Sequence, residues 1–161
     1  SGRLIEDHLR RIIRRASWEL MDLRINFFDP FKEAYGFVAG DDVLRFTAML
    51  MGEIVDEFGT PHDFIGHPGG DNFIIITTEE AAPKIMPRLK TRFAEEVLTH
   101  YNFMDREKGY ILASNEERQM VKTPLMTLAV GSVSPSKHQF ADIREITELA
   151  AEARRSDAGR A

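Results

Sequence analysis

A short stretch in the middle of the chain, "GHPGGDNFIIITTEE" (residues 66–80), combines flexible backbone with a carboxylate. Gly69 and Gly70 interrupt an apolar, β-branched run, and Asp71 follows them directly. A Gly-Gly pair lets the backbone turn at positive φ and lets a ligand approach without a Cβ in the way. The aspartate adds a hard oxygen ligand, so this corner suits a phosphate bound together with a divalent cation. Taken alone, however, Gly-Gly-Asp in a hairpin is more often only a turn.

Two histidines near this corner are weaker candidates for chemistry. His62 and His67 flank Asp63, and two histidines with one aspartate could suggest a metal site. They straddle an expected strand and lack a defined ligand spacing. We therefore interpret them as surface histidines.

Hydrophobic periodicity predicts the elements that must position the hairpin. Helices are expected over residues 3–16, 41–58, 79–101 and 140–156, and residues 29–40 form a loop or a short helix. Asp41 is expected to cap its helix, and Pro87 to interrupt the next one early. Strands are expected over residues 18–28, 63–67, 71–78, 109–114 and 124–134, with a turn at 115–122.

The order of these elements predicts the fold class. Helices alternate with strands, yet a hairpin sits in the middle, which favours an α/β (α+β) fold with a mixed, mostly antiparallel central sheet and flanking helices. Within the first strand, Leu23 and Ile25 should face one side, and Asp22, Arg24 and Asn26 the other.

Composition narrows the class of protein. The 161 residues fit a single domain, residues 1–161, which we expect to be a fragment of a larger multidomain protein. The net charge of −5 argues against a nucleic-acid partner, and no apolar run reaches the roughly 18 residues of a membrane span. The chain has no cysteine and no visible signal peptide, so we expect a cytoplasmic location.

Four segments in the right order resemble the GGDEF domain, the diguanylate cyclase family, over nearly the whole chain. The signature hairpin reads Gly69-Gly70-Asp71-Asn72-Phe73; the other three segments are "YGFVAGDDVL", "MTLAVGSVS" and "GRLIEDHL". Residues 100–122 are longer than the family minimum and suggest an insertion.

The resemblance implies a fold related to the nucleotidyl cyclases and a specific activity. Active members condense two GTP molecules, one on each of two facing domains, into cyclic di-GMP. Carboxylates hold two Mg²⁺ ions, and the 3′-hydroxyl of one GTP attacks the α-phosphate of the other. Because the two GTP molecules lie on facing domains, the resemblance implies a homodimer. Sensor or receiver domains typically flank such a domain, so flanking domains are also expected partners.

Several site residues carry over from the family by position. Asp71 matches a metal-ligand carboxylate, and Gly69 and Gly70 match the glycines over which the nucleotide lies. Asp41 matches an aspartate that accepts from guanine. Arg154, Arg155 and Arg160 are candidate phosphate clamps near the end of the last helix, although a basic helix C-terminus explains them equally well.

Other positions depart from the family pattern. Ungapped alignment from "YGF" puts Arg24 where the family has its first metal-binding aspartate and Asn26 on the second. Lys32 falls where an asparagine reads guanine, and Asn72 replaces the glutamate at a catalytic position. Asp22 or Asp29 could supply the missing metal ligand, and Asp22 shares the strand face of Arg24.

Upstream of the signature, the family's product-inhibition motif, Arg-x-x-Asp, reads Thr60-Pro61-His62-Asp63. The arginine that would grip a phosphate or guanine is missing, which makes feedback inhibition at this position doubtful.

Charge decides between the resulting hypotheses. A guanidinium near a divalent ion repels it by several kcal/mol at intermediate dielectric, and a neutral Asn72 cannot be a general base. The leading hypothesis is therefore a degenerate GGDEF domain, a regulatory module that binds GTP without efficient turnover. One alternative is an active cyclase with substitute metal ligands, and another is a protein-interaction module with no nucleotide binding.

Overall fold

The computed structural model describes residues 2–15 and 17–159. Its helices are α1 (Gly2–Ile12), α2 (Phe28–Tyr35), α3 (Phe37–Phe58), α4 (Ala82–Glu96), the 3₁₀ turn η1 (Val97–His100), α5 (Phe103–Lys108) and α6 (Ile143–Ala158). Its strands are β1 (Trp18–Asn26), β2 (Phe64–Gly69), β3 (Asn72–Thr78), β4 (Tyr110–Ser114), β5 (Met120–Pro124) and β6 (Thr127–Val133).

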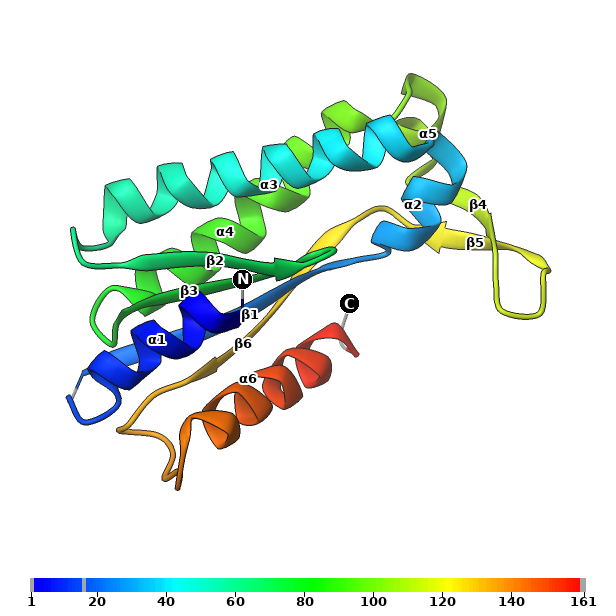
Figure 1. The fold of residues 1–161 in the computed structure, drawn as a ribbon. Helices are drawn as coiled ribbons and strands as arrows, with labels where there is room; N and C mark the ends of the chain where they lie inside the picture. Colours follow the sequence, from blue (N-terminus) through cyan, green and yellow to red (C-terminus); the bar gives the residue numbers. More distant parts are fainter. Residues whose placement is uncertain (1, 16, 160–161) are drawn as a thin grey trace.

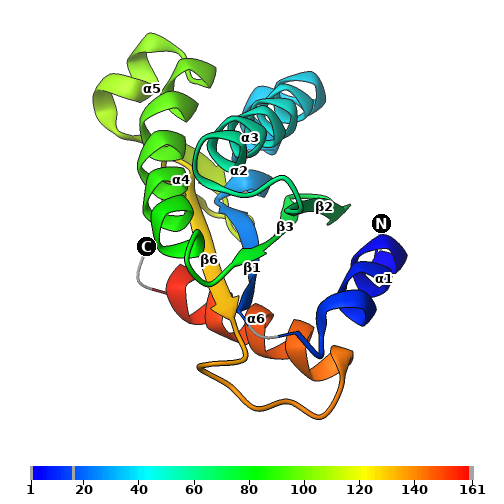
Figure 2. The ribbon, with the colours of Figure 1, turned by 90° about the vertical axis from the view of Figure 1, so that its left-hand side faces the viewer.

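The main sheet has the order β2-β3-β1-β6, and each of its neighbouring pairs is antiparallel. Helices α3 and α4 cover one face, whereas α1 and α6 lie on the other (Figure 1, Figure 2). The expected α/β class with an antiparallel sheet and flanking helices is confirmed.

The two faces of β1 bury different sets of residues, as the alternation predicted. Met21, Leu23 and Ile25 join the core beneath α3 and α4. Trp18 and Leu20 join a second core with residues of α1 and α6. Asp22 and Arg24 follow on this second face, so the sheet directs both toward the side of α6.

Four details of the predicted elements were wrong. Helix α3 begins at Phe37, directly after Gly36, so Asp41 lies inside the helix and does not cap it. The backbone of Gly36 has φ 98°, which lets α3 start at once after α2. Helix α4 continues through Pro87; Pro87 is close to the helix start, and it removes only the hydrogen bond to the Pro83 carbonyl.

The other two details concern segments whose state depends on distant partners. The segment expected as a turn, residues 115–122, contributes the start of strand β5, which pairs with β4. The long helix expected over residues 79–101 ends at Glu96 and gives way to a 3₁₀ turn. The element bounds of α1 and α6 also differ from expectation by a few residues, as helix ends commonly do.

Candidate nucleotide site

The hairpin corner around Asp71 lies at one end of the sheet, where the β2–β3 hairpin meets the end of β1. Arg24 pairs with Asn72 across the two strands, and the Ile25 amide donates to the Asp71 carbonyl at 3.2 Å. The side chain of Asp71 is therefore held next to the outer part of β1. This register brings Asp71, Asn72, Arg24 and Asp22 to one side of the sheet.

The backbone of the hairpin tip is open. Gly70 has φ +55°, a conformation that explains the glycine by itself. Gly69 has no positive φ, and a Cβ built on it would meet nothing within 4 Å. Within residues 2–15 and 17–159, neither a positive φ nor a close contact requires glycine at position 69, and the space over it is open.

His67 steadies this tip from the opposite strand. Its Nε2 lies 2.7 Å from the Gly70 carbonyl, so this nitrogen donates to it. Its ring stacks on Phe73 with centroids 4.4 Å apart. The histidine thus bridges the hairpin; the sequence had indicated only a surface histidine, because a cross-hairpin contact leaves no signal in the sequence.

Asp71 has a cation beside it. The Arg24 Nε lies 3.5 Å from Asp71 Oδ1, with the Arg24 side chain 46% and the Asp71 side chain 23% exposed. The carboxylate predicted to hold a metal is thus partnered by a guanidinium from the neighbouring strand.

Asp22 is buried, and one of its carboxylate oxygens accepts two hydrogen bonds. Its Oδ1 accepts from the Arg154 Nε at 2.9 Å and from the Asn72 Nδ2 at 2.7 Å. Asn72 also donates to the Leu23 carbonyl at 2.8 Å. Burial raises the pKa of Asp22 above its ordinary value, although Asn72 and Arg154 act in the opposite direction.

A glycine allows Arg154 to reach this position. Gly131 of β6 lies opposite Asp22 of β1, and a Cβ on Gly131 would lie 2.1 Å from the Arg154 backbone nitrogen. Helix α6 therefore rests directly on the sheet at this point, which carries Arg154 into the interior. Of the three arginines predicted as phosphate clamps, Arg154 is 6% exposed and forms a buried ion pair, Arg155 is exposed, and Arg160 lies outside the described residues.

Sequence reasoning missed the role of Asp157, one helical turn beyond Arg154. Its Oδ2 accepts from Lys90 Nζ at 2.7 Å and from the Val130 amide at 2.9 Å. Together with Arg154 it fixes α6 against β6 and α4. The i, i+3 spacing of the two residues was the available signal, because it places both on one helix face.

Lys32 and Asp41 lie on α2 and α3, which follow β1. Lys32 is exposed, and its ammonium lies 5.5 Å from the centre of the Phe28 ring. Its chain also passes Gly40, where a Cβ would come within 3.0 Å of the Lys32 Cγ. Within residues 2–15 and 17–159, no hydrogen bond or ion pair joins Lys32 or Asp41 to the hairpin.

The residues of the altered product-inhibition motif form a closed turn. Asp63 accepts from the Thr60 amide and the Thr60 hydroxyl at 2.8 and 2.7 Å, and from the Thr77 hydroxyl at 2.8 Å. Both carboxylate oxygens are thus occupied by the chain itself. In the described part of the chain, no group of three His, Asp or Glu side chains converges to hold a metal ion.

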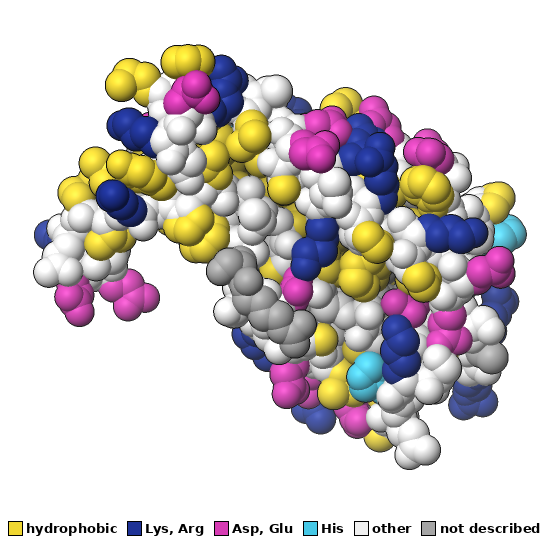
Figure 3. Space-filling model, turned by 180° about the vertical axis from the view of Figure 1, so that it is seen from behind, with side chains coloured by type: hydrophobic (Ala, Val, Ile, Leu, Met, Phe, Trp, Pro, Cys, Tyr) yellow, Lys and Arg dark blue, Asp and Glu magenta, His cyan; other side chains and the backbone are white. Residues whose placement is uncertain are grey.

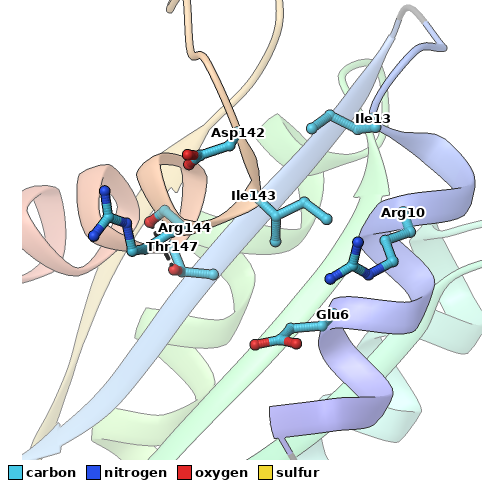
Figure 4. Close-up of a pocket in the computed structure, with 7 residues that line it drawn as sticks. All are labelled: Glu6, Arg10, Ile13, Asp142, Ile143, Arg144 and Thr147. Atoms are coloured by element: carbon cyan, nitrogen blue, oxygen red, sulfur yellow. Dashed lines mark hydrogen bonds between the residues drawn. The ribbon is translucent and has the colours of Figure 1, made fainter.

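A cavity of about 450 Å³ lies between α1 and α6, outside the hairpin corner (Figure 4). Arg10 and Glu6 line it from α1, and Arg144 and Thr147 line it from α6. Asp142 already caps the helix there, since its Oδ1 accepts from the Glu145 amide at 2.9 Å. With both charge signs present and the helix end capped, this cavity shows no preference for an anion.

Comparison with known proteins gives one family and one fold. The sequence profile of the family described as "Diguanylate cyclase, GGDEF domain" matches residues 3–120. None of the curated protein sequences matches the chain significantly. Among the described residues, no helix is long and apolar enough to cross a membrane.

Solved structures with this fold come from several bacteria. The active GGEEF domain of a diguanylate cyclase from Vibrio cholerae is 22% identical, with a TM-score of 0.64 over 96% of this chain and 85% of the other. The GGDEF domain of DgcB from Caulobacter crescentus, in complex with c-di-GMP, is 18% identical, with a TM-score of 0.63 over 99% and 82%. The diguanylate cyclase SiaD from Pseudomonas aeruginosa, in complex with its activator SiaC, is 23% identical, with a TM-score of 0.61 over 99% and 52%.

Proposed function

The chain belongs to the GGDEF domain family, and within it we propose a regulatory module of cyclic di-GMP signalling that binds a guanine nucleotide without efficient turnover. The observation that carries this proposal is the ion pair between Arg24 and Asp71, at 3.5 Å. The position expected to gather Mg²⁺ holds a guanidinium, and a cation close to a divalent ion repels it by several kcal/mol at intermediate dielectric.

The donor set around the hairpin does not fit a pair of magnesium ions. Asp71 has Arg24 beside it, and the nearest substitute carboxylate, Asp22, accepts from Arg154 and Asn72. The Asn72 side-chain amide donates to Asp22 and to the Leu23 carbonyl. A metal ion bound through Asp22 Oδ1 would have to compete with the Arg154 guanidinium and the Asn72 amide, and no step of our proposal depends on one.

Nucleotide binding is supported by the features that remain. The open backbone at Gly69 leaves room for a ligand over the hairpin. Arg24 and Lys32 are both exposed and basic, so each could meet a phosphate directly and replace some of the charge of a metal. Asp41 would then accept from guanine, as its position in the family suggests.

The proposal extends to partners that this chain does not contain. One relative of the same fold, SiaD, was solved with its activator SiaC. By analogy we propose that flanking sensor or receiver domains, or a separate protein, read the state of this domain in the cytoplasm.

Thermal unfolding with GTP tests the binding. A ligand at about 100 times its dissociation constant stabilises the native state by roughly 2.7 kcal/mol. We expect GTP to raise the melting temperature equally with Mg²⁺ and with a chelator. Gly69→Ala should abolish the shift, because its methyl group would occupy the ligand space. Gly52→Ala is the matched control, since a Cβ there also meets nothing within 4 Å but lies in α3.

Chromatography after incubation with GTP and Mg²⁺ tests the turnover. We expect no cyclic di-GMP above background. Clear turnover would favour the alternative of an active cyclase with substitute ligands, and no thermal shift at millimolar GTP would favour a pure interaction module. In Arg24→Asp, which replaces the cation with the family's carboxylate, the GTP-induced shift should become dependent on Mg²⁺.

A further inference from the structure

Strands β4 and β5 form a two-stranded sheet of their own, separate from the main sheet. With α5 they make a projection, residues 103–124, which we call the arm (Figure 1). One side of the arm is anchored: Ile111, Ala113 and Thr123 are buried. Ser114 donates to Glu33 at 2.6 Å, and the Tyr35 hydroxyl donates to Asp105. The arm is therefore a built part of the domain.

The arm concentrates exposed hydrophobic side chains. Of ten large hydrophobic residues that are exposed within the described part of the chain, five belong to the arm: Phe103, Met104, Leu112, Met120 and Val121. Four of these are more than half exposed, at 66, 65, 54 and 64% in the order Phe103, Met104, Leu112, Met120. Figure 3 shows hydrophobic side chains gathered over this projection.

Strand β5 presents an open backbone edge. Helices α2 and α5 contact β4, so β5 is the outer strand. The Asn115 amide donates to the Gln119 carbonyl at 2.9 Å, which shows which opposite residues of the β4–β5 ladder form hydrogen-bonded pairs and which do not. By that alternation, Met120 and Lys122 occupy the pairs that are not hydrogen-bonded to β4, so their N–H groups point outward. An exposed apolar edge of this kind is a template for another strand.

The charge of the arm indicates that the strand pairing with this edge is β5 of a second copy. Residues 103–124 hold four basic and four acidic residues, so the whole net charge of −5 resides in the rest of the chain. Two copies that meet through their arms avoid that like-charge repulsion. The arm tip carries Glu116, Glu117 and Arg118 and has a net charge of −1, whereas Lys122 of β5 lies nearer the base, where the charges of α5 balance one another. An antiparallel, two-fold pairing turns each net negative tip toward the base of the other copy, where Lys122 adds one positive charge.

We propose that the arm is a homodimerisation surface, in which β5 of two copies pair antiparallel to form a four-stranded sheet. Leu112 and Met120 then lose exposed area, and both open edges gain hydrogen-bond partners. This association needs no nucleotide and is independent of the proposed function, because the arm is distinct from the hairpin corner.

Sedimentation of the full chain over a range of micromolar concentrations tests the proposal. Without nucleotide we expect a species of twice the 18.4 kDa chain mass. Met120→Lys should raise the dissociation constant at least about tenfold, a change of about 1.4 kcal/mol. Met49→Lys is the matched control, since Met49 is 58% exposed on α3, and it should leave the dimer intact.

A second variant separates edge pairing from loss of an apolar contact. Met120→Pro removes an outward N–H without removing a β4–β5 hydrogen bond, and it should also yield monomers. Circular dichroism must show that each variant stays folded. A monomeric wild type, or a Met120→Lys protein that dimerises as well as wild type, would overturn the proposal; a dimer formed only with GTP would point to the hairpin corner instead.

Discussion

Two carboxylate–guanidinium pairs lie at the same end of the sheet in opposite surroundings. The side chains of Asp22 and Arg154 are each 8% exposed and 2.9 Å apart, whereas those of Arg24 and Asp71 are 46 and 23% exposed and 3.5 Å apart. Both pairs involve β1, two residues apart on one face. The buried pair fixes α6 on the sheet, and the exposed pair lies at the hairpin corner where we propose that a nucleotide binds.

The difference follows from what covers each position. Gly131 lets α6 lie directly on the sheet above Asp22, and the helix excludes water there. Arg24, two residues nearer the strand end, stays exposed. A buried charge is costly to leave without a partner, whereas an exposed one is hydrated by water.

Removing the guanidinium of the buried pair should have the largest effect. Arg154→Met keeps most of the side-chain volume but leaves Asp22 buried without its cation. We expect a loss of about 3–5 kcal/mol in the free energy of unfolding, measured by urea denaturation. Arg155→Met, at the exposed neighbouring position, is the control and should change stability by no more than about 0.5 kcal/mol. A loss of under about 1 kcal/mol in Arg154→Met would show that the pair is not effectively buried.

A double-mutant cycle should then recover part of that loss. In Asp22→Asn with Arg154→Met, no charge remains in the interior, and the asparagine oxygen can still accept from Asn72. We expect the double variant to lose about 1–3 kcal/mol less free energy of unfolding than the two single variants lose in sum. Additive effects would mean that the two side chains stabilise the protein separately.

The sequence predicted the strand face of these residues but not their partners. Alternation along β1 placed Asp22 and Arg24 on one side of the sheet, and the structure confirms it. Local sequence does not say which helix lies over that face, nor how closely. The contact between Arg154 and Asp22 spans 132 positions and depends on the missing side chain at Gly131.

Other parts of the fold also differ in how far their own residues predict them. Long periodic segments, such as α3 and β3, were predicted from their own residues. Strand β5 was not, because its residues become a strand by pairing with β4. Asp41 has the side chain of a good cap, yet Gly36 starts the helix earlier and overrides that local preference. Gly69, Gly70 and Asp71 stood out from their residue types, whereas Asn72 and the cation beside Asp71 were recognised only by alignment with the family.

The pH dependence of stability offers a smaller test of the buried pair. Burial raises the pKa of Asp22 in the folded state. The Asp22 carboxyl group therefore keeps its proton to higher pH in the native protein than in the unfolded chain. The stabilisation is fully present below the ordinary carboxyl pKa and is lost as pH rises through the folded value. The stability of wild type relative to Asp22→Asn should fall over that window, as measured by urea denaturation at several pH values; a relative stability that rises instead would reverse the assigned direction.

Breaking the exposed pair should have the smallest effect on stability and the clearest dependence on salt. Arg24→Ala leaves Asp71 in contact with water, so we expect a change of no more than about 1 kcal/mol in the free energy of unfolding. Salt should reduce this difference further, because the Debye length falls from about 10 Å at 0.1 M to 3 Å at 1 M. Arg154→Met should keep its deficit in the same titration. If Arg24→Ala instead destabilised the protein as much as Arg154→Met, the guanidinium beside Asp71 would be part of the architecture, and its availability to a phosphate would no longer follow from its exposure.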